Sequence, residues 1–64
     1  MKYSELKKIL RQNGCYKLDE GSNHEKWYSP ISKKIFQVGR HNSEDVPKGT
    51  CNAILKQSGI KREE

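Results

Sequence analysis

The sequence has few of the features that stabilise small secreted domains or that indicate a membrane protein. Of its 64 residues only 31% are hydrophobic, and there are two cysteines, Cys15 and Cys51. One possible bridge is not the disulfide framework of a secreted domain, so we expect a reduced, cytoplasmic protein. No apolar segment approaches the roughly 20 residues that cross a bilayer, and no signal-peptide core follows the first basic residue. The sequence predicts one domain over residues 1–64, with a stability margin of roughly 3–5 kcal/mol.

Spacings typical of metal sites are also missing. Cys15, His24, His41 and Cys51 are side chains of the types that bind zinc, but they form no C-x₂-C or H-x₃-H pair. Neither cysteine has a neighbouring base in the sequence that would activate a thiol nucleophile. Cys51 falls on the apolar face of a predicted helix, where a small core residue is expected. We therefore expect no metal and no cofactor.

Charge is present in excess and of one sign. Thirteen lysines and arginines outnumber eight aspartates and glutamates, which leaves a formal net charge of +5. Such an excess in a short chain favours a polyanionic partner, and nucleic acid fits better than a membrane or an acidic protein. Lys7, Lys8 and Arg11 near the N-terminus are interpreted as the solvated face of a helix.

Two helices are predicted, over residues 4–13 and 47–58. Ser4 is a suitable N-cap for the first helix, and Asn13-Gly14 supplies a left-handed residue at its end. Pro47 fits the first position of the second helix, where its missing amide is not needed. Apolar residues recur at helical spacing in both segments: Leu6, Ile9 and Leu10 in the first, Ile54 and Leu55 in the second.

Three short strands are predicted between the helices, over residues 15–19, 24–29 and 33–40. Residues 20–23 and 29–32 contain the glycine, asparagine, serine and proline typical of turns. The predicted fold is therefore an α+β, α-β-β-β-α arrangement. Both helices pack on one face of a three-stranded antiparallel sheet.

Alternation along the strands assigns side chains to the two faces of this sheet. Trp27 is expected to point at the helices, and Glu25 shares its face near the solvent edge. The residues predicted on the helix side are Glu25, Trp27, Phe36 and Val38. Those predicted on the open side are His24, Lys26, Tyr28 and Gln37.

His24 is the residue best suited to chemistry. An imidazole exchanges protons near neutral pH, so it could remove the proton from a ribose 2′-hydroxyl before that oxygen attacks the adjacent phosphate. Neighbouring lysines would hold the phosphate and stabilise its developing charge. His24 could instead be a surface histidine that bonds to its own turn. His41 could be an acid–base group, an RNA contact or a loop residue, and the leaving-group acid could be Lys26 or His41.

RNA contacts are predicted from cations that gather around one region of the sheet, with a tyrosine available for stacking. The predicted RNA-binding residues are Lys17, Lys26, Tyr28, Lys33, Lys34, Arg40 and His41. These residues alone leave two functions open besides catalysis. The domain could bind RNA without cleaving it, or its positive surface could chiefly recognise an acidic protein.

Three stretches resemble the HicA family of bacterial ribonuclease toxins. The first helix ends in Asn13-Gly14, as the lysine-rich first helix of the family ends in glycine. Residues 21–27 (Gly-Ser-Asn-His-Glu-Lys-Trp) resemble the family's Gly-Ser-His-x-x-aromatic signature. Residues 47–60 are similar to its closing Gly-Thr-Leu-x-x-Ile-Leu-Lys-Gln-Ala-Gly-Leu. This chain departs from the family by one extra residue, Asn23, and by losing the proline of a Val-Pro-x-His ending whose histidine is His41.

The resemblance implies a function beyond what the residues indicate. It implies a fold like that of double-stranded-RNA-binding domains, and a toxin that cleaves mRNA as a metal-independent endoribonuclease. The signature turn is then Gly21, Ser22 and Asn23, and His24 is the catalytic general base. The resemblance further implies a HicB-type antitoxin as partner, which would inhibit by covering His24.

Overall fold

The computed structural model describes residues 1–60. The elements are α1 (Tyr3–Gln12), β1 (Tyr16–Glu20), β2 (His24–Ser29), β3 (Lys34–Gly39) and α2 (Lys48–Ser58). This order confirms the predicted α+β fold, and every element begins and ends within one residue of its predicted bounds. Within the described residues, neither helix has the length or apolar character needed to cross a membrane.

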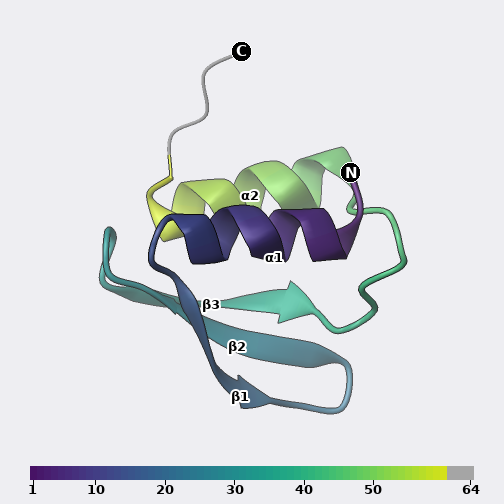
Figure 1. The fold of residues 1–64 in the computed structure, drawn as a ribbon, viewed down its shortest axis with the longest axis horizontal. Coiled ribbons are helices and arrows are strands. Elements are labelled where there is room, and N and C mark those ends of the chain that lie inside the picture. Colours follow the sequence, from purple (N-terminus) through teal and green to yellow (C-terminus); the bar gives the residue numbers. More distant parts are fainter. Residues whose placement is uncertain (61–64) are drawn as a thin grey trace.

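The three strands form one antiparallel sheet in the order β1-β2-β3. Both helices lie over the same face of this sheet, and the other face carries no element of residues 1–60 (Figure 1). Pairing between β2 and β3 is unbroken, from His24 opposite Gly39 to Ser29 opposite Lys34. Pairing between β1 and β2 shifts at a bulge around Leu18. The two faces of β2 and β3 are therefore the predicted ones.

The core lies between the helices and the sheet. It consists of Leu6, Leu10, Cys15, Trp27, Phe36, Val38, Val46, Ile54, Leu55 and Ile60. Trp27 is fully buried, and the guanidinium carbon of Arg11 lies 5.4 Å from the centre of its ring. Arg11 therefore covers a core side chain, although the sequence predicted only a solvated helix face.

The start of α1 differs from the prediction that Ser4 is its N-cap. The helix begins one residue earlier, and the first amides bond to a distant loop instead of to a side chain. The amide of Tyr3 donates to the carbonyl of Glu44 (3.0 Å), and that of Ser4 donates to the carbonyl of Asn42 (3.1 Å). The loop between β3 and α2 thus satisfies the start of α1. No local pattern could have indicated an acceptor about forty residues away.

Glycine and proline bound the helices nearly as predicted. Gly14 follows α1 with φ 89°, and Gly59 ends α2 with φ 76°, both in the left-handed region that glycine tolerates. Pro47 precedes α2 as its N-cap and is not its first helical residue.

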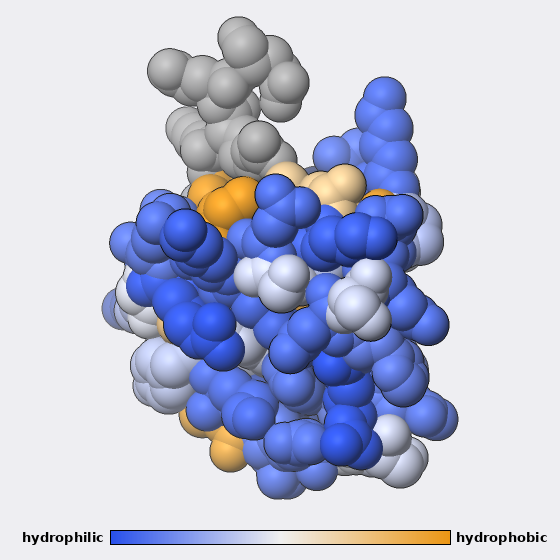
Figure 2. Space-filling view, turned by 45° about the vertical axis from the view of Figure 1, so that its right-hand side comes forward, coloured by the Kyte–Doolittle hydropathy of each residue, from blue (hydrophilic) through white to orange (hydrophobic). Residues whose placement is uncertain are grey.

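Figure 2 shows one side of the molecule on which hydrophilic residues predominate, with apolar areas only near its upper and lower margins.

Candidate nuclease site

An open hollow surrounds His24 at one end of the sheet. Its volume is about 300 Å³, and its lining is polar: Asp19, Gly21, Ser22, Asn23, His24, Glu25, Lys26 and Gln37. The lining comes from the ends of β1 and β2, from the turn that joins them, and from the middle of β3. The hollow therefore forms only when the three strands pair.

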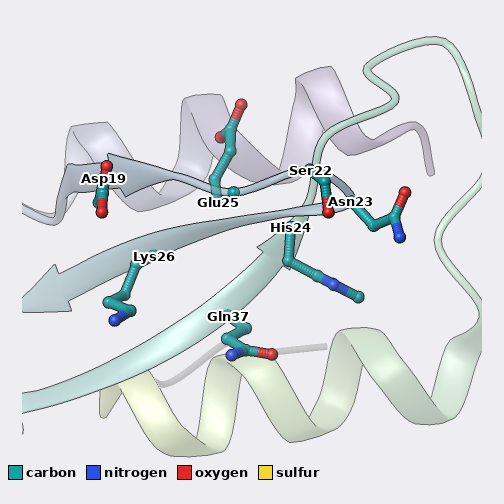
Figure 3. Close-up of a pocket in the computed structure, with 8 residues that line it drawn as sticks. Asp19, Ser22, Asn23, His24, Glu25, Lys26 and Gln37 are labelled. Atoms are coloured by element: carbon teal, nitrogen blue, oxygen red, sulfur yellow. The ribbon is translucent and has the colours of Figure 1, made fainter.

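His24 is the first residue of β2 and its side chain is exposed. His24 and Lys26 leave β2 on one side, and Glu25 leaves on the other side, toward α1 (Figure 3). The imidazole of His24 makes no hydrogen bond to another side chain or carbonyl within residues 1–60. An imidazole without such partners is available to a bound ligand, and this weighs against a purely structural role in the turn.

The turn before His24 is tight. The amide of Gly21 donates to the carbonyl of His24 at 2.7 Å, so Ser22 and Asn23 form the tip of the hairpin. A Cβ atom on Gly21 would lie 3.1 Å from that carbonyl oxygen, which explains the glycine at this position. Asn23, the residue that this chain has in addition to the family signature, therefore lies at the tip, and β2 keeps its register beyond it.

Arg40 fastens this turn to the end of β3. Its Nη2 atom lies 2.8 Å from Oε2 of Glu20, and its Nη1 donates to the carbonyls of Ser22 (3.0 Å) and Gly21 (3.3 Å). Lys17 also pairs with Glu20, at 3.2 Å. Arg40 and Lys17 were predicted as RNA contacts, but both form an ion pair with Glu20 in the structure. The sequence could not show the Arg40–Glu20 pair because these residues meet only after β1, β2 and β3 have paired, whereas the Lys17–Glu20 pair lies within β1.

A buried ion pair lies on the other side of the sheet from His24. The Nζ of Lys7 is 3.1 Å from Oε1 of Glu25, and the Lys7 side chain is only 3% exposed. Lys7 also donates to Oδ1 of Asn42, while the indole of Trp27 donates to Glu25 at 3.0 Å. Two predictions are therefore wrong: Lys7 is not on a solvated face, and Glu25 is not at the solvent edge.

The environment of Glu25 lowers its pKa. Burial raises the pKa of this carboxyl, but hydrogen bonds from Trp27 and Lys7 and the charges of Lys7 and Lys17 together outweigh burial. The net direction is below the ordinary value of 4.5. Glu25 therefore stays ionised at neutral pH and pairs with Lys7. Because Glu25 directly follows His24 in β2, this pair fixes the backbone next to His24 to α1.

Lys26 is the predicted RNA contact that the structure places beside His24. It lies opposite Asp19 of β1 and Gln37 of β3, and all three side chains line the hollow. Gln37 was predicted on the open face but not as part of the site, and Asp19 was missed. The bulge at Leu18 brings Asp19 opposite Lys26. Such a bulge leaves no clear mark in the sequence.

The remaining predicted contacts do not gather around His24. Lys34 pairs with Ser29 at the opposite end of β2, and Lys33 lies in the adjoining turn with φ 58°. Tyr28 lies on the same face as His24, four residues along β2. His41 is exposed in the loop after β3 and does not line the hollow. The predicted cationic cluster is therefore spread along the sheet.

The cysteines and histidines are not assembled into a metal site in the described part of the chain. Cys15 is buried, Cys51 packs at the margin of the core, and both are free thiols. Within residues 1–60, no three side chains of His, Cys, Asp or Glu lie close enough together to hold a metal ion.

Comparisons with known proteins agree with the resemblance seen in the sequence. The family model for the HicA toxin of bacterial toxin–antitoxin modules matches residues 3–60. A protein of Photorhabdus laumondii subsp. laumondii named "Probable mRNA interferase HicA 2" is 36% identical over 61 residues, which cover 95% of this chain and all of that protein. No solved structure matches the chain significantly. The chain belongs to the HicA toxin family.

Proposed function

We propose that this protein is a metal-independent endoribonuclease toxin that cleaves mRNA, with His24 as the general base. The observation that carries the proposal is the exposed His24 imidazole in a polar hollow, on the same face as Lys26. Membership of the HicA family and the name of the relative from Photorhabdus, an mRNA interferase, support the same activity.

The chemistry needs one base, one acid and a positive charge. His24 takes the proton of a ribose 2′-hydroxyl, and the oxygen attacks the adjacent phosphorus. A bond from O2′ to phosphorus forms and the bond from phosphorus to O5′ breaks, which leaves a 2′,3′-cyclic phosphate and a 5′-hydroxyl end. The 5′-oxygen receives a proton as it leaves. The Lys26 ammonium lines the hollow and His41 does not, so we assign the acid to Lys26.

Lys26 also supplies electrostatic stabilisation. Its positive charge would stabilise the negative charge that builds on the phosphate oxygens during attack. Gln37 and the hydroxyl of Ser22 add hydrogen-bonding groups to the same lining. The RNA backbone would cross the open face of the sheet at this end, because the helices cover the opposite face.

A HicB-type antitoxin is the proposed inhibitor. The hollow is open to solvent, so a protein surface laid over the end of the hairpin would block access to His24 without altering its chemistry. Family membership supports an antitoxin partner. Coverage of His24 predicts that the purified complex leaves RNA intact, and that removing the antitoxin restores cleavage.

The test compares two exposed histidines in one assay. Purified wild type, His24→Ala and His41→Ala are incubated with single-stranded RNA in EDTA, and the new 3′ ends are analysed for cyclic phosphate. His24→Ala should lower the rate by roughly 10²–10⁴-fold, the usual contribution of a general base, while His41→Ala stays near wild type. Cleavage that survives His24→Ala would remove His24 from the mechanism. RNA that binds but stays intact with wild type would indicate a binding module.

A further inference from the structure

Three apolar side chains, two of them exposed and one half-buried, form a row across the open face of the sheet. Tyr16 of β1 lies opposite Tyr28 of β2, and Tyr28 lies opposite Ile35 of β3. Paired residues of antiparallel strands project from the same face, so these three side chains are neighbours. The rings of Tyr16 and Tyr28 are 5.5 Å apart with a tilt of 48°. We refer to Tyr16, Tyr28 and Ile35 as the apolar row.

The apolar row does not serve the core. Both helices pack on the other face of the sheet, where the core residues lie. Tyr16 is 50% exposed and Ile35 is 58% exposed, in a chain whose hydrophobic content is only 31%. Beyond the contact between Tyr16 and Tyr28, these exposed positions bury little apolar area on folding. Contiguous apolar surface on such a domain is typical of a binding site.

The row is continuous with the candidate site along β2. His24, Lys26 and Tyr28 alternate on one face, so Tyr28 lies about 13 Å from His24 along the strand. Lys26 lies between them. Lys34 lies opposite the buried Ser29 and so leaves β3 on the helix side, while Lys33 is in the adjoining turn. Within residues 1–60 these three lysines take part in no ion pair.

We propose that the apolar row is a base-binding subsite for single-stranded RNA, which takes a base flanking the cleaved phosphate. The inference rests on the proposed nuclease function and extends its site along the sheet. Tyrosine rings stack on the face of any base, and Lys26, on the same face as Tyr28, would contact the phosphate backbone. Single-stranded RNA consists of planar bases joined by negative phosphates, and this chemistry complements a tyrosine pair beside Lys26.

Binding is measured with 2′-O-methyl RNA, which lacks the attacking hydroxyl and so stays intact in the presence of active protein. Tyr16→Ala and Ile35→Ala are compared with wild type and with Ile31→Ala, an exposed apolar residue outside the row. Loss of one stacked base weakens binding about tenfold. Tyr16→Ala should show this loss, Ile35→Ala a smaller one, and Ile31→Ala none. Thermal unfolding of each variant separates lost contact from lost fold.

An abasic scan locates the subsite. Single abasic nucleotides are placed at successive positions of a 2′-O-methyl RNA that carries one cleavable 2′-hydroxyl. Wild type should lose kcat/KM when the abasic nucleotide is at one position away from the cleaved bond, and that effect should vanish in Tyr16→Ala. Equal RNA affinity of wild type and folded Tyr16→Ala would overturn the proposal. So would a Tyr16→Ala variant that is impaired only in binding an antitoxin.

These outcomes separate the subsite from the catalytic proposal. If RNA binds through the row but is not cleaved, the nuclease mechanism fails and the subsite stands. If RNA is cleaved at wild-type kcat/KM by Tyr16→Ala, the subsite fails and the mechanism stands.

Discussion

Arg40 Nη2 lies 2.8 Å from Oε2 of Glu20, and this ion pair spans from the end of β3 to the end of β1. The same guanidinium donates to the carbonyls of Gly21 and Ser22, so it fixes the turn that leads into His24. Arginine suits this position because its planar group presents several donors in a fixed geometry. We assign Arg40 as a positioning residue, since it acts on His24 through the turn.

The Arg40 assignment predicts separate effects on catalysis and on RNA binding. Arg40→Ala should lower kcat roughly 10- to 100-fold, because small displacements of a catalytic group are costly. Glu20→Gln, which removes the charge that Arg40 pairs with, should also lower kcat. The dependence of 2′-O-methyl RNA affinity on salt should keep its slope in Arg40→Ala. A slope reduced by about 0.7 would instead identify Arg40 as a phosphate contact.

The Lys7–Glu25 pair predicts strong coupling in stability. Removing one member of a buried ion pair leaves the other charge unpaired and costs about 3–5 kcal/mol. Lys7→Met and Glu25→Gln should therefore each lower the urea midpoint sharply. The double variant should cost clearly less than the sum, because the introduced amide oxygen would still accept from Trp27 and no buried charge remains. If the two single losses in the free energy of unfolding simply added in the double variant, the ion pair would contribute little. An osmolyte can restore folding of the single variants so that they can be measured.

The lowered pKa of Glu25 predicts a particular dependence of stability on pH. A carboxyl whose pKa in the folded state lies below its ordinary value of 4.5 stabilises the fold above that value. This stability is lost as pH falls through the folded pKa. The free energy of unfolding should therefore differ most between wild type and Glu25→Gln at neutral pH, and the difference should shrink below pH 4.5. A difference that stays constant to lower pH would contradict the direction of the shift.

Gly39 predicts a steric effect that a second substitution relieves. A Cβ atom at Gly39 would lie 2.9 Å from Cζ of Tyr3, so Gly39→Ala must displace the Tyr3 ring. Overpacking of this kind costs about 1–3 kcal/mol. In a Tyr3→Ala background the same change should be neutral or favourable, because alanine restricts the unfolded chain more than glycine does. Urea unfolding of the four proteins tests this, and an equal cost of Gly39→Ala in both backgrounds would exclude the contact.

The order of elements and the faces of β2 could be read from the sequence. Trp27 is expected to point at the helices, and if it does, the two-residue period of a strand puts His24 and Lys26 on the open side. Because β2 and β3 pair without a bulge, this period persists over the whole of β2. Gly14 and Gly59 likewise predicted the ends of both helices.

Tertiary structure alone decided which charged residues form ion pairs within the protein and which stay exposed on the open face of the sheet. Lys7 and Glu25 are 18 positions apart in the chain, and Arg40 and Glu20 are 20 apart, yet each pair shares an ion pair. A lysine on a helix carries no local mark of burial, since its partner depends on which strand residue packs beneath it. The sequence by itself determined that His24 stands on the open face. The fold determined that Arg40 holds its turn and that Tyr16, Tyr28 and Ile35 meet, because contacts across strands follow from register and not from neighbours in the chain.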